Sequence, residues 1–156
     1  MWWIGIDVGT QNGICFLESR MKIIELASID FIKYRAEGFL DRCENMFRTH
    51  EITTPWVDNV VISIEAIARY AGKANSYGRA IAVGQVRERS KETVHTFQRA
   101  GYTVVEVYPV SGWTKWKKDY FNKFFDWDKK SNQDQRDAGC IAERGRQKFL
   151  KTHRVT

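Results

Sequence analysis

Four acidic residues in this sequence have types and positions suited to holding divalent cations. Asp7 interrupts the apolar run "WWIGIDV", and Glu65 ends the apolar run "VVISIE". Asp is disfavoured inside strands, and burying an unpaired carboxylate is costly. Asp134 and Asp137 are three residues apart, which places them on one face of a helix. If these carboxylates converge, their repulsion requires cations between them, and hard oxygen ligands suit Mg²⁺ or Mn²⁺.

Two such cations in one site activate the attacking water and stabilise the leaving oxygen in phosphodiester cleavage. The pattern therefore predicts metal-assisted hydrolysis of nucleic acid. Each acid also has a structural interpretation. Asp7 could cap a turn, and Glu65 could pair with Arg69. Asp134 and Asp137 could compensate a helix macrodipole. The prediction rests on the combination of the acids.

Hydrophobic patterning predicts an α/β scaffold beneath these acids. The run 60–67 is continuous, apolar and β-branched, which is typical of a central strand covered on both faces. We expect a mixed sheet, with a three-stranded antiparallel meander and parallel strands, flanked by helices. The expected strands are 2–8, 14–19, 21–31, 60–67 and 101–109, and the expected helices are 34–50, 75–99 and 131–153, the last capped by Ser131 or Asn132.

The acids converge if two conditions on this scaffold are met. The first and fourth strands must be neighbours in the sheet, which places Asp7 beside Glu65. The start of the last helix must lie across their ends, which adds Asp134 and Asp137.

Composition restricts the class of protein. The 156 residues, 43% of them hydrophobic, predict one folded domain. Cys15, Cys43 and Cys140 are far apart, which argues against a disulfide framework or a thiolate zinc site. No apolar run approaches the roughly 20 residues of a membrane span, and no secretory signal is recognisable. We therefore expect a cytoplasmic protein without a membrane partner.

The charge balance favours a polyanionic partner. The chain carries 25 basic and 19 acidic residues, for a net charge of +6. In the segment 111–130, "SGWTKWKKDYFNKFFDWDKK", we expect Lys115, Lys117 and Lys118 to contact nucleic-acid phosphates, and Arg87 or Arg89 to add to them. The aromatic residues of this segment recur at helical spacing. They form either part of the core or an exposed surface for stacking on unpaired bases.

Three stretches together resemble the RuvC-type Holliday junction resolvases: "IGIDVGTQNGICFLE", "VVISIEAIARYAGKANSYGRAIAVGQVR" and "NQDQRDAGCIAERG". Their order matches over nearly the whole chain. The resemblance implies a ribonuclease H-like fold for a single endonuclease domain over 1–156. It implies a homodimer that cleaves four-way or branched DNA with two Mg²⁺ ions per site, replaceable by Mn²⁺, and with no nucleotide cofactor. By this resemblance the catalytic and metal-binding acids are Asp7, Glu65, Asp134 and Asp137.

The sequence also departs from the bacterial members of that family. They carry an aromatic residue that stacks on a base where this chain has Ala68. We expect Arg69, Tyr70 and Lys73 to lie at the DNA: Tyr70 is the nearest aromatic residue to the missing ring, and the alternative is that Arg69 reaches the DNA instead. The resemblance also implies that Lys117 or Lys118 assists catalysis. The aromatic, lysine-rich segment 111–130 indicates a phage-encoded member, acting in the host cytoplasm.

Other functions fit parts of the sequence. The opening "IGIDVGTQ" also occurs in sugar kinases and actin-like ATPases, which need two such domains. A RuvC-like RNA-processing nuclease is a closer alternative, but that family has a Gly-Leu-Pro turn where this chain has Glu65. The third alternative is a non-catalytic binder of branched nucleic acid, although bare carboxylates repel phosphate unless a metal is present.

The helix expected at 75–99 carries the small residues Ala80, Ala82 and Gly84. These residues either admit a second copy of the chain or pack against the protein's own sheet.

Overall fold

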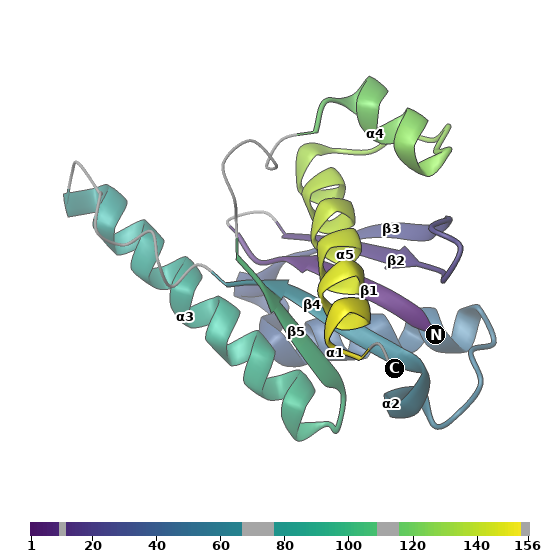
Figure 1. The fold of residues 1–156 in the computed structure, drawn as a ribbon. Coiled ribbons are helices and arrows are strands. Elements are labelled where there is room, and N and C mark those ends of the chain that lie inside the picture. The colour runs from purple at the N-terminus through teal and green to yellow at the C-terminus, as the bar shows by residue number, and fades with distance from the viewer. Residues whose placement is uncertain (10–11, 67–76, 109–115, 154–156) are drawn as a thin grey trace.

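The computed structural model describes residues 1–9, 12–66, 77–108 and 116–153 (Figure 1). Five strands form one sheet in the order β3-β2-β1-β4-β5. β1, β2 and β3 pair antiparallel, and β4 pairs parallel with both β1 and β5. The strands are β1 (Trp2–Asp7), β2 (Asn12–Leu17), β3 (Ile23–Ile29), β4 (Val60–Glu65) and β5 (Thr103–Val107), and the helices are α1 (Phe31–Thr49), α2 (Trp56–Asn59), α3 (Tyr77–Arg99), α4 (Lys118–Phe125) and α5 (Gln133–Thr152).

Helices cover both faces of the sheet, and the strand residues alternate between two apolar layers. Ile4, Ile6 and Phe16 point to the layer shared with α1 and α3. Trp3 and Cys15 point to the opposite layer, shared with α4 and α5. Burial on both sides explains why the central strands read as continuous apolar runs rather than alternating ones.

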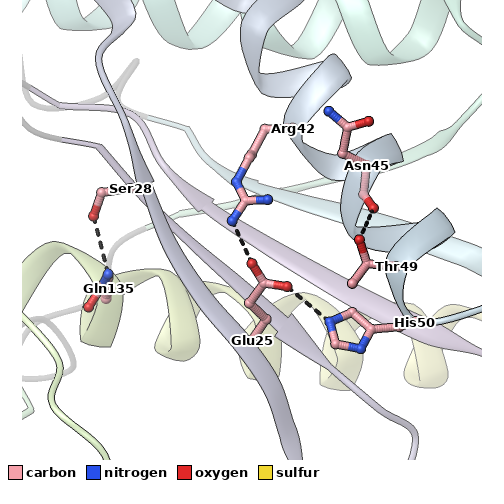
Figure 2. A network of polar contacts seen from close by, with 7 residues as sticks. All are labelled: Glu25, Ser28, Arg42, Asn45, Thr49, His50 and Gln135. Carbon is pink, nitrogen blue, oxygen red and sulfur yellow. Dashed lines mark hydrogen bonds and ion pairs between the residues drawn. The ribbon is translucent and has the colours of Figure 1, made fainter.

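A polar bridge ties the edge strand β3 to α1. The Glu25 carboxylate accepts a hydrogen bond from Arg42 at 2.5 Å and lies 2.9 Å from Nε2 of His50 (Figure 2). The bridge fixes the outer strand of the meander against the helix that covers it.

Helix α5 lies unusually close to the sheet, because glycines stand where it crosses β1 and β2. A Cβ atom at Gly5 would overlap the carbonyl oxygen of Ala138, and one at Gly13 would overlap the backbone of Asp134. Gly13 is the register partner of Asp7. The first turn of α5 is thereby placed directly over the end of the strand that carries Asp7.

The predicted elements appear close to their expected positions, with three differences. The short helix α2 follows Pro55 and was not predicted, because the turn-forming residues of this stretch gave no helical signal. Helix α1 begins at Phe31 and bends at Arg35, whose φ of 59° lies in the left-handed region. The aromatic segment 111–130 forms α4 over Lys118–Phe125, whereas 109–115 lies outside the described residues.

Two further expectations can be compared with the structure. Asn132, one of the two expected caps of the last helix, is the N-cap residue of α5. In the described part of the chain, no helix combines the length and apolar character needed to cross a membrane.

The close approach of α5 predicts that Gly5→Ala destabilises the protein by about 3 kcal/mol or more, since overpacking at a rigid backbone contact cannot relax. The matched control is Gly84→Ala in α3, where an added Cβ meets nothing within 4 Å. There the change should be neutral or stabilise by up to about 1 kcal/mol, because Ala is the better helix former. Urea unfolding of both variants measures the difference. Equal stabilities would contradict the packing described for α5.

Candidate active site

Two of the predicted acids lie side by side at the carboxyl ends of parallel strands. Ile6 of β1 is in register with Ile64 of β4, and the next residue on each strand is an acid, Asp7 and Glu65. Side chains alternate along a strand, so both acids point to the sheet face that α5 covers. The expected neighbourhood of the first and fourth strands is confirmed.

The first turn of α5, which carries Asp134, is fixed by a capping box. The Asn132 side chain accepts a hydrogen bond from the Gln135 backbone N–H at 2.8 Å, and the Gln135 side chain accepts one from the Asn132 N–H at 3.1 Å. Both amide groups also donate to Oγ of Ser28 on β3 at 3.3 Å, the Gln135 contact being drawn in Figure 2. The helix start is therefore attached to the sheet and has little freedom to shift.

Glu65, Asp134 and Asp137 lie close enough to Asp7 to change its ionisation. Burial has the largest effect on the pKa of Asp7 and, together with the charges of Glu65, Asp137 and Asp134 in that order of effect, raises it to about 8. Burial and the charge of Asp137 also raise the pKa of Glu65. The fold thus brings all four predicted carboxylates within electrostatic reach of Asp7, and it disfavours the charged forms of Asp7 and Glu65.

Helix α3 holds the two strand ends from the other side of the sheet. Ser90 is buried, and its Oγ donates a hydrogen bond to the carbonyl oxygen of Glu65 at 2.7 Å. Arg89 reaches the Gly9 carbonyl oxygen at 3.4 Å, and its guanidinium lies 5.5 Å from the centre of the Phe31 ring. Both residues fix the backbone on which the acids stand. Sequence reasoning missed Ser90 and offered Arg87 or Arg89 as a contact to DNA.

Gln133 is a second residue that sequence reasoning missed. Its side-chain amide donates a hydrogen bond to Oδ1 of Asp137 at 2.7 Å. The two residues are four apart on α5, and this helical spacing was a visible signal for a contact. The hydrogen bond orients the Asp137 carboxylate at the start of the helix.

The side chains of the four acids are of the type that binds a divalent cation, but they lie too far apart for three of them to share one ion. Carboxylate oxygens are the ligands that Mg²⁺ and Mn²⁺ prefer, and a cation would relieve the repulsion that raises the pKa of Asp7. Among the residues that the structure describes, however, no three acidic, histidine or cysteine side chains lie close enough together to hold one ion. An ion shared by three of these carboxylates would require them to lie closer together than they do here.

The structure describes only some of the residues that were predicted to contact DNA. Arg69, Tyr70, Lys73 and Lys115 lie outside the described residues. Lys117 and Lys118 are exposed at the start of α4, with Lys117 in the N-cap position.

Comparison with known proteins supports the fold. No family model and no curated protein sequence matches this chain. Among solved structures, the chain is similar to T. thermophilus RuvC in complex with a Holliday junction substrate, with a TM-score of 0.58 and 13% sequence identity. The match covers 98% of this chain and 96% of that chain. The chain therefore has the ribonuclease H-like fold of RuvC, which confirms the predicted fold class.

The electrostatic cluster predicts a pH dependence of stability in a chelator. The folded protein holds a proton on Asp7 up to about pH 8, whereas the unfolded carboxyl has its ordinary pKa of 3.8. Stability should therefore fall as pH rises between these two values. Asp7→Asn should flatten this fall and raise the Tm at pH 8 by several degrees, since each kcal/mol corresponds to about 2–4 °C at this size.

Asp119→Asn, a change of an exposed carboxylate on α4, is the matched control and should leave the slope of Tm against pH unchanged. An equally steep fall in the Asp7→Asn protein, followed by calorimetry from pH 5 to pH 8, would contradict the cluster.

Proposed function

We propose that this protein is a structure-specific endonuclease that cleaves four-way and other branched DNA by metal-assisted phosphodiester hydrolysis. The observation that carries the proposal is the cluster of four carboxylates at the ends of β1 and β4, beneath the first turn of α5. The RuvC fold supports it, since a solved structure with this fold is bound to a Holliday junction substrate.

The four acids would hold two divalent cations, Mg²⁺ with Mn²⁺ as a substitute. When bound, such ions supply activation of water and neutralisation of charge at the leaving oxygen. Asp7 and Glu65 contribute rigidity, because both stand on strands paired in the centre of the sheet. Asp134 and Asp137 stand on a helix start that the capping box fixes. The backbone positions of the four acids are thus fixed. Their carboxylates would approach a cation by rotation of the side chains alone.

The basic residues position the substrate. Exposed Lys117 and Lys118 are suited to phosphate contacts, which fix a nucleic acid in place without reading its sequence. Lys115 and the residues Arg69, Tyr70 and Lys73 complete this proposed DNA surface, with Lys117 or Lys118 assisting catalysis.

The central test is a cleavage assay with Asp7→Asn. The wild-type protein should cut a synthetic four-way junction in Mg²⁺ or Mn²⁺, and the variant should lose cleavage by a factor of at least about 100 while binding the junction. Asp7→Asn removes a charged cation ligand but no surface that faces the DNA backbone. Asp119→Asn is the matched control and should keep its activity.

The substrates should include a linear duplex, a three-way junction and a structured RNA. Cleavage in a chelator, or full activity of Asp7→Asn, would contradict the metal-assisted mechanism. Preferential cleavage of the RNA would favour the RNA-processing alternative.

We also propose that the protein acts as a symmetric dimer through the start of α3. Figure 1 shows this part of the helix extending past the sheet. Ala82 is exposed, Ile81 is 45% exposed, and an added Cβ at Gly84 would meet nothing. Ala82 and Gly84 thus favour contact with a second copy over packing on the protein's own sheet, whereas the side chain of Ala80 lies outside what the structure describes. Two incisions related by twofold symmetry need two active sites, which such a dimer supplies.

The dimer predicts sedimentation at about twice the chain mass of 18.2 kDa. Ile81→Glu should yield monomers, because it places a charge at the centre of the apolar contact. Leu150→Glu on α5, where the leucine is 42% exposed, is the matched control and should remain dimeric. Sedimentation velocity at micromolar concentration decides this point. A monomeric wild-type protein, with junction bound, would reject the dimer.

A further inference from the structure

Helix α4 carries aromatic rings on two faces, and only one face is used by the core. Phe121 and Phe125 are buried against α5. On the other side, Tyr120 is 54% exposed and Phe124 is 38% exposed. Exposed aromatic groups that gather in one patch commonly mark a binding surface. The outer face therefore needs an explanation that the core does not provide.

The outer rings are arranged as a group with Trp116. The Trp116 ring lies edge-on to Tyr120 at 4.7 Å and to Phe124 at 4.8 Å between ring centres. The Tyr120 and Phe124 rings are nearly parallel, at 25°, with their centres 6.2 Å apart. We call these three residues the aromatic platform. Because Trp116 braces both rings, the platform offers flat surfaces that are already ordered before a ligand arrives.

The aromatic platform adjoins the acidic cluster. Trp116 packs against the small apolar group formed by Val107, Cys140 and Ile141. Val107 is the register partner of Glu65, and Cys140 lies one helical turn beyond Asp137. A ligand held at the acids would therefore extend toward α4.

The charge around the aromatic platform favours an anion. From 117 to 130, on and beside α4, exposed lysines outnumber exposed aspartates by five to three: Lys117, Lys118, Lys123, Lys129 and Lys130 against Asp119, Asp126 and Asp128. These lysines disfavour a second copy of the same basic surface and suit a phosphate backbone. Flat rings beside ammonium groups are the combination that binds unpaired nucleotides, because every base has a π face.

We propose that the aromatic platform stacks on unpaired DNA bases next to the cleavage site, with Tyr120 and Phe124 as the stacking rings. This inference deepens the proposed function and rests on it for the source of the bases, which are those unstacked at a branch point. Bases inside a duplex present their faces to one another, so the aromatic platform selects unpaired strands.

The test is a binding measurement in a chelator, which separates stacking from cleavage. Fluorescence anisotropy compares a labelled oligothymidylate with a duplex of equal charge. Tyr120→Ala combined with Phe124→Ala should weaken oligothymidylate binding by about fivefold or more, given the usual contribution of one stacked base. Duplex binding should change less than twofold. Tyr120→Phe, which keeps the ring, should bind as the wild type does.

Tyr34→Ala is the matched control, because Tyr34 is 49% exposed and has Lys33 5.0 Å from its ring centre, yet lies on α1. It should leave oligothymidylate binding unchanged. Thermal unfolding of each variant shows whether the fold is retained.

An equal loss of affinity for oligothymidylate and duplex, or no loss for either, would overturn the proposal that the aromatic platform stacks on unpaired bases. So would a change of oligomeric state in the double variant, since a second copy would then cover these rings. If the wild-type protein stacks on oligothymidylate but cuts no branched DNA, the proposed function fails while the binding site stands.

Discussion

Helix α5 lies directly on the backbone of β1 and β2, because Gly5 and Gly13 present no side chain to it. This contact decides where Asp134 lies relative to Asp7, since Gly13 faces the first turn of the helix and pairs with Asp7 across the strands. The geometry of the candidate site is thus a consequence of backbone packing. Side chains only refine it, through the capping box and its contacts with Ser28.

The site combines a rigid frame with an unfavourable charge arrangement. Burial and like charges raise the pKa of Asp7 to about 8, so a cation among these acids would offset both the burial and the repulsion that keep Asp7 protonated. The frame tolerates this because each acid is attached to a well-supported element. Ser90 anchors the Glu65 backbone from one sheet face, while α5 closes the other. The tight packing of α5 and the hydrogen bond from α3 therefore hold the acids close together in spite of their repulsion.

The sequence predicted the fold, and the pairing of the strands that carry Asp7 and Glu65, better than it predicted the residues that hold these strands in place. Asp7 and Glu65 were visible because a carboxylate is conspicuous in an apolar strand, and helical spacing joined Asp134 to Asp137. Ser90 gave no signal, since its hydrogen bond to Glu65 depends on how α3 packs on the sheet. The aromatic spacing in 111–130 could not show which rings face outward, because α4 has aromatic residues on both sides.

Diffraction at the manganese absorption edge, from crystals of the protein soaked in Mn²⁺, tests the account most directly. The account predicts anomalous density bounded by Asp7, Glu65 and at least one carboxylate of α5, with the four acids closer together than in the metal-free protein. That density should disappear in Asp7→Asn crystals. Manganese bound elsewhere, with the acids left apart, would contradict the claim that this cluster is a metal-dependent active site.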